Sequence, residues 1–311
     1  MLEQTFHMSD GYRLPLYHFK PNTPAKAAIL IIHGAGEHGK RYTECAQFLV
    51  AAGFAVITYD QRGHGQNLKD RKVTHMGDSA KAHDLVHDVK TLVDTLRDLY
   101  PNRPIFTVAH SMGAFVMRSV LNQYPKTVDG TVLIGSSVFP TWQVKAIRRL
   151  AKGIRFLFGP SHVSRFLTRL TQDRPYRAMV KRGLITERDA WVTHDQSRRE
   201  LAKNDPLIGV PFTITSQIVL MSLMLKAQDV RKLTTHHFTG HMAILCGDED
   251  PVCDFGAGVE TLKNLYKPYC KRPIFGRCYT GLRHELLQEK KRMDIDADLQ
   301  KIFEGWLNKN A

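Results

Sequence analysis

Long hydrophobic runs are missing from this sequence of 311 residues. A helix that crosses a bilayer needs about 20 predominantly apolar residues in a row. The longest candidates, residues 48–59 and 218–225, are interrupted or short. The first 19 residues also lack the basic start and continuous apolar core of a signal peptide. We therefore expect a cytoplasmic protein without a membrane-spanning helix.

Cysteine is sparse, and its spacing is uninformative for metal binding. There are five cysteines, and none of them forms a C-x-x-C pair. They are Cys45, Cys246, Cys253, Cys270 and Cys278. An odd number without paired spacing is typical of free thiols in a reducing compartment, not of a disulfide framework or a zinc site. We expect no metal and no other cofactor.

Acidic residues are absent between Asp129 and Asp173. From Thr141 to Glu200 there are 14 Lys or Arg and 5 Asp or Glu, so this region carries +9 of the formal net charge of +14. Such a basic excess favours an anionic partner. Because no nucleic-acid-binding motif and no strip of aromatic and basic residues accompanies it, nucleic acid is not expected. An anionic membrane surface is the other candidate.

Strands and helices are expected to alternate along most of the chain. Apolar, β-rich runs predict strands near residues 3–7, 13–19, 27–32, 54–59, 104–109, 130–135, 241–246 and 273–279. Helices are predicted near residues 41–52, 80–99, 112–123, 254–266 and 290–308. This alternation predicts a mostly parallel sheet flanked by helices, with a hairpin of the first two strands at one edge.

The alternation stops between residues 139 and 235, where the pattern becomes helical. We therefore divide the chain into a core domain, 1–138 and 236–311, and an inserted helical cap, 139–235. Apolar residues recur at helical spacing among basic ones early in the cap: Trp142, Ile147, Leu150, Ile154, Leu157 and Phe158. A basic amphipathic helix is typical of a membrane surface. A lid helix that buries its apolar stripe on the core explains the pattern equally well.

One serine stands between small residues directly after a predicted strand. The run 104–108 leads into Ala109-His110-Ser111-Met112-Gly113, and a helical pattern follows at once. A strand, a tight turn and a helix are the context in which a G-x-S-x-G motif holds a nucleophile, and the flanking positions must be small. Gly113 meets this demand, and Ala109 departs from it by one methyl group. Ser111 is therefore the candidate nucleophile.

A serine hydroxyl needs a base to accept its proton and an acid to orient that base. After Ser111, the predicted strand at 241–246 ends in an acidic turn, from which we expect Asp250 to be the orienting acid. The competing acids are Asp248, Glu249 and Asp254. His284 follows the last predicted strand, on a loop before a charged helix. The order serine, acid, histidine makes His284 the candidate base.

Two backbone N–H groups are candidates for the oxyanion hole, the donors that stabilise the tetrahedral intermediate of acyl transfer. Met112 follows the nucleophile and can supply one. Ala35 lies in the Gly-rich loop after the predicted strand at 27–32 and can supply the second. Glycines on both sides of Ala35 let that backbone approach the site closely. At the start of the cap, Phe139 and Trp142 are candidates for contact with substrate.

Six segments together resemble the α/β-hydrolase superfamily and, within it, the monoacylglycerol lipase and lysophospholipase group. They are HGAGEHGKRY (33–42), YDQRGHGQN (59–67), AHSMGA (109–114), NDPL (204–207), GDEDPVCD (247–254) and GLRHELLQE (281–289). They occur in family order and span nearly the whole chain. The resemblance implies Ser111 as nucleophile, Asp250 as acid, His284 as base, and backbone N–H groups of Ala35 and Met112 as oxyanion donors.

The resemblance also implies a lipase-like esterase whose substrates are lysophospholipids or monoacylglycerols. Arg62 and Glu37 match family positions and are expected to brace loops. Aminopeptidases, small-ester esterases and thioesterases share the fold and are alternatives. An aminopeptidase needs a carboxylate in the cap to hold the substrate's free amine, and the acid-poor cap argues against this alternative. A non-enzymatic protein that binds membranes or nucleic acid is disfavoured because every triad position is filled.

Overall fold

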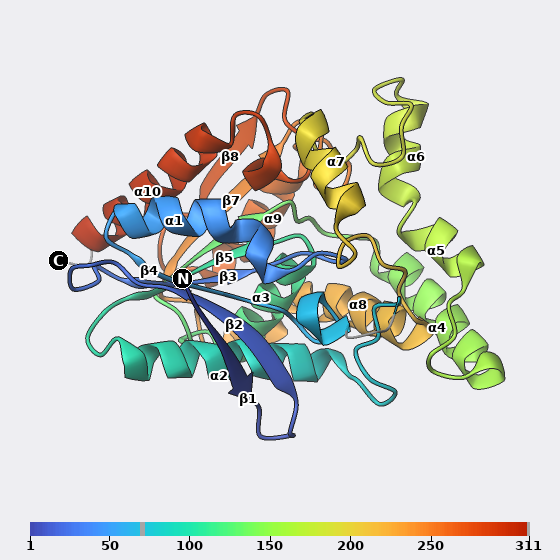
Figure 1. Cartoon of the computed structure of the whole chain (residues 1–311), viewed down its shortest axis with the longest axis horizontal. Coiled ribbons are helices and arrows are strands. Elements are labelled where there is room, and N and C mark those ends of the chain that lie inside the picture. Colours follow the sequence, from blue (N-terminus) through green and yellow to red (C-terminus); the bar gives the residue numbers. More distant parts are fainter. Residues whose placement is uncertain (69–71, 310–311) are drawn as a thin grey trace.

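A twisted eight-stranded sheet forms the centre of the protein in a computed structural model, which describes residues 1–68 and 72–309 (Figure 1). The strand order is β1-β2-β4-β3-β5-β6-β7-β8. The strands are β1 (Leu2–His7), β2 (Arg13–Phe19), β3 (Ala28–Ile32), β4 (Ala55–Tyr59), β5 (Ile105–His110), β6 (Gly130–Ile134), β7 (His241–Gly247) and β8 (Phe275–Tyr279). β2 pairs antiparallel with β1 and β4, and the other neighbouring strands are parallel. The predicted mostly parallel sheet with an edge hairpin is confirmed.

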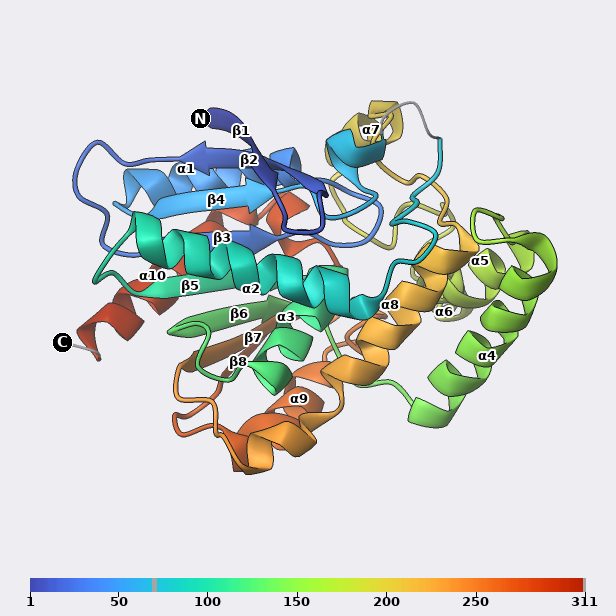
Figure 2. The same ribbon diagram turned by 90° about the horizontal axis from the view of Figure 1, so that it is seen from below.

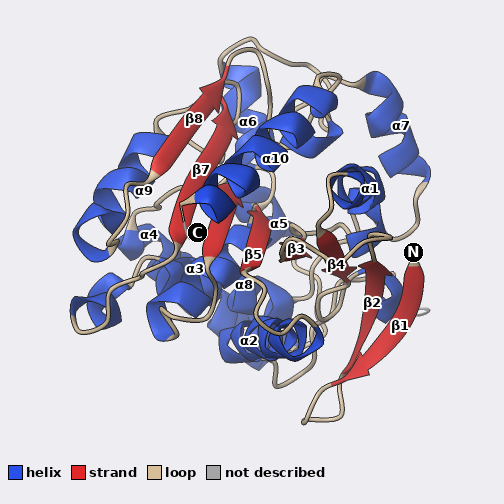
Figure 3. Cartoon of the chain, turned by 90° about the vertical axis from the view of Figure 1, so that its left-hand side faces the viewer, coloured by secondary structure: helices blue, strands red, loops and turns tan. Residues whose placement is uncertain are grey.

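Helices cover both faces of the sheet (Figure 3). On one face lie α1 (Thr43–Ala51) and α10 (Arg292–Asn308). On the other lie α2 (Ala82–Leu99), α3 (Met112–Gln123) and α9 (Gly258–Tyr266). Short 3-10 helices are η1 (Gly39–Tyr42), η2 (Gly65–Leu68), η3 (Val230–Thr234), η4 (Lys267–Tyr269) and η5 (Leu286–Gln288). The central strands are buried along their whole length, as their continuous apolar runs predict.

The predicted strand boundaries agree with the structure to within two residues. The largest difference at a helix is α9, which begins at Gly258 and not at the predicted residue 254. Asp254 and Phe255 have φ angles of 49° and 51°, and Gly256 has 94°. This left-handed turn cannot be part of a right-handed helix, so the helix starts after it.

Five helices lie between β6 and β7, beyond the carboxyl ends of the parallel strands (Figure 2). They are α4 (Thr141–Phe158), α5 (Arg165–Thr171), α6 (Arg174–Lys181), α7 (Gln196–Asn204) and α8 (Ile214–Ala227). α8 packs against both α3 and α4. The division into domains at residues 139 and 235 stays a prediction. None of the helices in the described part of the chain has both the length and the apolar content to cross a bilayer.

The apolar residues of α4 were predicted to form one stripe on a single face of the helix. This prediction is wrong. Val144 and Ala151 are buried against α8, with Ile147 and Ile154 half-buried beside them. The remaining members of the predicted stripe are exposed instead: Trp142, Leu150, Leu157 and Phe158. The sequence pattern merged two faces, because α4 carries apolar side chains both toward α8 and toward solvent.

Candidate active site

Ser111 lies in the tight turn between β5 and α3. Its φ and ψ angles are 50° and −114°, a conformation that side-chain-bearing residues rarely adopt. Gly113 is required at this turn, because a Cβ there would lie 2.3 Å from the backbone oxygen of Ile32 at the end of β3. Ala109, the residue that replaces the usual first glycine, is fully buried in β5. The strained turn presents the Ser111 hydroxyl beyond the carboxyl end of the strand.

A chain of two hydrogen bonds joins Ser111, His284 and Asp250. The Ser111 Oγ lies 2.9 Å from Nε2 of His284, and the His284 Nδ1 lies 3.0 Å from Oδ2 of Asp250. Asp250 is 0% exposed and His284 3% exposed. The second carboxylate oxygen, Oδ1, accepts a hydrogen bond from the Val252 N–H at 2.8 Å, which fixes the carboxylate. A buried carboxylate in this place selects the imidazole tautomer whose Nε2 can accept the serine proton.

Two of the three competing acids have other partners, and the third is exposed. Asp248 Oδ1 accepts a hydrogen bond from the Gly281 N–H at 2.7 Å. Glu249 Oε2 lies 3.0 Å from His194 Nε2 and 3.2 Å from Arg283 Nε. Asp254 is exposed in the left-handed turn before α9. Of these four acids, Asp250 is the one whose carboxylate bonds the His284 ring.

The loop after β3 closes over the nucleophile. A Cβ built on Gly34 would lie 3.2 Å from the Ser111 Cβ, so the Gly34–Ala35 backbone passes directly beside the serine. Met112 is the first residue of α3, where backbone N–H groups have no acceptor within their own helix. Both predicted oxyanion donors therefore lie on backbone adjacent to Ser111, and the glycine permits the approach.

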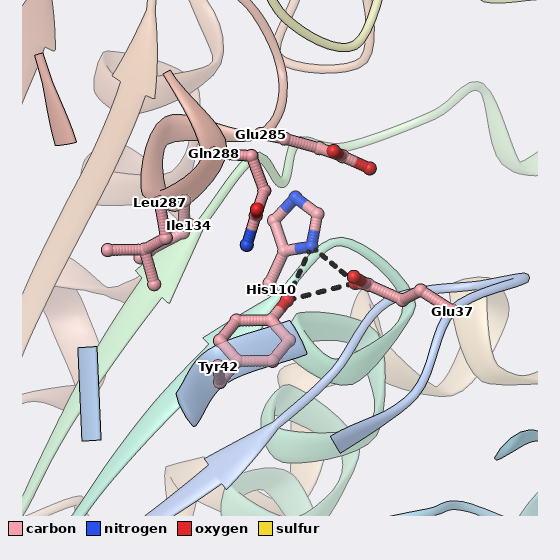
Figure 4. Close-up of a pocket in the computed structure, with 7 residues that line it drawn as sticks. All are labelled: Glu37, Tyr42, His110, Ile134, Glu285, Leu287 and Gln288. Carbon is pink, nitrogen blue, oxygen red and sulfur yellow. Dashed lines mark hydrogen bonds and ion pairs between the residues drawn. The ribbon is translucent and has the colours of Figure 1, made fainter. Parts of the chain in front are cut away.

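A buried polar cluster surrounds His110, the residue before Ser111 (Figure 4). Glu37 Oε1 accepts hydrogen bonds from the Gly34 N–H at 2.5 Å and the Tyr42 hydroxyl at 2.9 Å, and Glu37 Oε2 pairs with Arg41 at 2.6 Å. His110 Nδ1 lies 3.0 Å from Glu37 Oε1. Glu37 thus ties the oxyanion loop to β5, in line with the bracing role expected for it. Arg62, the other expected brace, pairs with Asp88 and Asp10 at 2.6 Å each.

In this cluster, charges and hydrogen bonds shift the pKa values of Glu37 and His110 in the direction opposite to the shift that burial alone would cause. Burial alone would raise the pKa of the Glu37 carboxyl, but Arg41 and His110 hold that pKa well below its usual value. Burial would likewise lower the pKa of His110, but the hydrogen bond and charge of Glu37 raise it above its usual value. Figure 4 shows Glu285 and Gln288 lining the same small space, which has a volume of about 10 Å³. This space is too small to hold a substrate.

The inserted segment contacts the candidate base directly. The ring of Trp191 lies 5.0 Å from the ring of His284, at an interplanar angle of 31°. The Arg283 guanidinium donates to the Ala190 carbonyl oxygen at 2.6 Å, and the Glu285 N–H donates to the Val192 carbonyl oxygen at 2.7 Å. Trp191 was not predictable from the sequence, because no spacing or motif connects it with His284.

The two predicted substrate-contact residues differ in their surroundings. Phe139 is half-buried and packs edge-on against Phe115 of α3, with ring centroids 5.9 Å apart. Trp142 is 71% exposed on α4. The structure thus brings Ser111, Asp250 and His284 together but leaves Trp142 on the outer surface. In residues 1–68 and 72–309, no group of three or more His, Cys, Asp or Glu is placed to hold a metal ion.

Relatives with similar sequences carry lipase names. The human monoglyceride lipase is 36% identical over 130 residues, which are 42% of this chain and 41% of that protein. The monkeypox virus monoglyceride lipase homolog is 26% identical over 303 residues, 97% of this chain and 96% of the viral protein. The match therefore spans about two fifths of the human protein's length but nearly the full length of the viral one.

Solved structures share the whole fold. A carboxyl esterase from Bacillus coagulans has a TM-score of 0.86 at 21% identity, and the match covers 98% of each chain. A monoglyceride lipase variant from Saccharomyces cerevisiae has a TM-score of 0.73 at 19% identity, covering 98% of this chain and 94% of the yeast chain. The family model described as serine aminopeptidase, S33 (Hydrolase_4) matches residues 23–291. The chain therefore belongs to this family of α/β hydrolases.

Proposed function

We propose that the protein is a serine carboxylester hydrolase with Ser111 as nucleophile, His284 as base and Asp250 as orienting acid. The observation that carries the proposal is the hydrogen-bond chain from the buried Asp250 through His284 to Ser111, on a strained strand-to-helix turn. This is the arrangement by which a hydroxyl becomes a nucleophile at neutral pH.

In the first half of the reaction, Ser111 Oγ attacks the ester carbonyl carbon while His284 Nε2 accepts the hydroxyl proton. The Asp250 carboxylate stabilises the imidazolium that forms. Negative charge develops on the former carbonyl oxygen, where the N–H groups of Ala35 and Met112 donate to it. His284 then gives its proton to the departing alcohol, and the acyl group stays on Ser111 as an ester.

In the second half, a water molecule attacks the acyl-serine carbonyl carbon, and His284 Nε2 accepts a proton from that water. The same backbone donors stabilise the second tetrahedral intermediate. When the intermediate collapses, His284 returns the proton to Ser111 Oγ and the carboxylic acid leaves. No redox step is needed.

The substrates we propose are monoacyl lipids, either monoacylglycerols or lysophospholipids. The support is twofold: similar proteins are named monoglyceride lipases, and the six matching segments resemble that group. An aminopeptidase is the second candidate, because the matching family model carries that name. Its substrate amine needs a carboxylate that is not already paired with a cation. Three carboxylates near the site are already paired: Glu37 and Glu285 with Arg41, and Glu249 with Arg283.

A fluorophosphonate probe tests the nucleophile. We expect the probe to label Ser111, and Ser111→Ala to lose labelling and to lower kcat on a short p-nitrophenyl ester by about 10⁴–10⁶-fold. Ser119→Ala is the matched control, because Ser119 lies on the same helix α3 and its hydroxyl bonds the Phe115 carbonyl oxygen. The control should keep labelling and activity. Labelling that persists in Ser111→Ala would refute the assignment.

A substrate panel tests the class. Monoacylglycerol, lysophosphatidylcholine, p-nitrophenyl butyrate and an aminoacyl p-nitroanilide are compared by kcat/KM. We expect a lipid ester to be the best substrate and the anilide to be hydrolysed at least 100-fold more slowly. An anilide preferred over every ester would establish the aminopeptidase alternative.

The surface of α4 supports a peripheral contact with an anionic membrane. The exposed aromatic side chains Trp142, Phe156 and Phe158 share this helix with the exposed cations Lys145, Arg149 and Lys152. Phe156 is 88% exposed and is followed by the exposed Leu157 and Phe158, and a contiguous exposed apolar patch is typical of an interaction surface. Cations attract anionic headgroups, while aromatic rings enter the interface. Arg148 is excluded from this set, because its guanidinium donates to Ser222 Oγ on α8 at 3.3 Å.

Vesicle co-sedimentation tests this contact. The wild type should bind phosphatidylserine-containing vesicles better than pure phosphatidylcholine vesicles, and added salt should weaken binding, because exposed charges are screened beyond about 8–10 Å. Changing Lys145, Arg149 and Lys152 to Gln should lower binding at least tenfold. The matched control changes the exposed Lys267, Lys271 and Lys301 to Gln, which removes the same charge from outside the inserted segment. Equal loss in both variants would refute a specific surface on α4.

A further inference from the structure

We propose that His110 is held as an imidazolium between the Glu37 carboxylate and the backbone carbonyl of His284, and that this fixed cation positions the base and sets the acid limit of activity. The inference rests on the proposed function, in which His284 accepts the proton of Ser111. It gives His110 the role of a positioning residue that acts through His284 without touching substrate.

Both ring nitrogens of His110 face hydrogen-bond acceptors. Nδ1 lies 3.0 Å from Glu37 Oε1, and Nε2 lies 3.2 Å from the His284 carbonyl oxygen. The Tyr42 hydroxyl, 3.1 Å from Nδ1, donates its own proton to Glu37 and so presents a lone pair to the ring. A neutral imidazole has one N–H and would leave one buried nitrogen lone pair against an acceptor oxygen. The doubly protonated ring satisfies every contact.

The carboxylate that stabilises this cation is itself held ionised. Glu37 Oε2 pairs with Arg41, and Glu37 Oε1 accepts from the Gly34 N–H and the Tyr42 hydroxyl. Glu285, bonded to the same Arg41 guanidinium at 2.8 Å, adds a second negative charge that also favours protonated His110. The hydrogen bond to Glu37 and the negative charges of Glu37 and Glu285 raise the pKa of His110 above its usual value. The titratable or charged groups that surround the His110 ring are thus Glu37, Tyr42, Glu285, Arg41 and the ring of His284.

The fixed charge acts on the candidate base at short range. The ring centroids of His110 and His284 are 4.8 Å apart, and the His110 ring also holds the His284 backbone carbonyl. His284 works as a base only while its own ring is neutral. A neighbouring cation disfavours a second positive charge on this ring, because like charges at short range repel each other. Asp250 acts in the opposite sense on the other His284 nitrogen. His110 therefore extends activity to lower pH.

Nitrogen NMR of ¹⁵N-histidine-labelled full-length protein tests the charge directly. At pH 7.5 we expect both ring nitrogens of His110 to be protonated, with the signal assigned by its loss in His110→Gln. Glu37→Gln should convert the ring to a singly protonated, neutral form at the same pH. A neutral His110 ring in the wild type would overturn the proposal. This readout does not depend on any enzymatic activity.

The pH dependence of kcat/KM on p-nitrophenyl butyrate tests the consequence. In His110→Gln the side-chain amide can still donate to the His284 carbonyl oxygen, but the charge is gone. The acidic limb of the profile should move to higher pH by about one to two units. His18→Gln is the control, since His18 is also buried but bonds Tyr100 at 2.6 Å, and its acidic limb should match the wild type. Coincident limbs in His110→Gln and wild type would overturn the proposal, whereas an inactive wild type would overturn the proposed function alone.

Discussion

Two parts of the inserted segment between β6 and β7 differ in what they contact. The outer helices α4–α6 (141–181) carry exposed apolar and basic side chains, including Trp142, Phe156 and Phe166. Hydrogen bonds join the inner stretch (190–209) to the segments that follow β3 and β8. His194 donates its backbone N–H to Glu289, and Asp205 bonds His38 at 2.9 Å. The difference indicates that one insertion has two tasks: the inner stretch holds the site and the outer helices offer a surface.

The largest expected effect comes from changing the proposed orienting acid in the site that the inner stretch contacts. Asp250→Asn should lower kcat on a soluble ester by about 10³–10⁴-fold, because the amide no longer stabilises the imidazolium and can favour the wrong tautomer. Asp248→Asn is the control and should cost less than tenfold, since Asp248 only accepts from the Gly281 N–H. Both variants are compared by circular dichroism to confirm folding. If Asp248→Asn is the more damaging change in a folded protein, the acid is misassigned.

A smaller effect should distinguish the two parts when one tryptophan is changed in each of them. Trp191→Ala should lower kcat/KM on a soluble ester by about 10- to 100-fold, because the His284 ring loses a packing partner and misplacement of a base by about 1 Å is costly. Trp191→Phe should stay within threefold of wild type. Trp142→Ala, in the outer helices, should leave the soluble-ester rate unchanged. Equal losses of kcat/KM in Trp191→Ala and Trp142→Ala would show that the two parts contribute equally to the site.

The smallest effect concerns apolar side chains of the outer helices. Changing Phe156 and Leu157 to Ser should lower vesicle binding about tenfold in a salt-independent manner, because this loss removes apolar burial and not charge. Tm should move by less than about 2 °C, since both side chains are exposed. Leu201→Ser on α7, also an exposed leucine, is the control and should bind vesicles as the wild type does. A large drop in Tm would mean that the outer surface is part of the folded core.

The sequence predicted the features that depend on local patterns. The central strands β3–β7 follow from continuous apolar runs, and the turn at Ser111 follows from small residues at fixed offsets. Contacts between distant segments were not predictable in this way. Trp191 and His284 are 93 positions apart, and His110 and Glu37 meet only because β3 and β5 are neighbours in the sheet. The division of α4 into a covered and an exposed apolar face was also not predicted, since periodicity shows that apolar residues share a spacing but not which neighbour covers them.

Helix α8 packs against two different parts of the protein. One side of it, through Val219 and Leu223, packs with α3 in the main core, and the other, through Ile214 and Met221, supports α4. α8 also returns the chain from the insertion toward β7. We expect α4–α6 to tolerate replacement better than α8, because α8 alone of these four helices contributes buried residues to the main core. Replacing residues 141–181 should therefore change the surface that these helices present more than it changes the packing of α8 on α3.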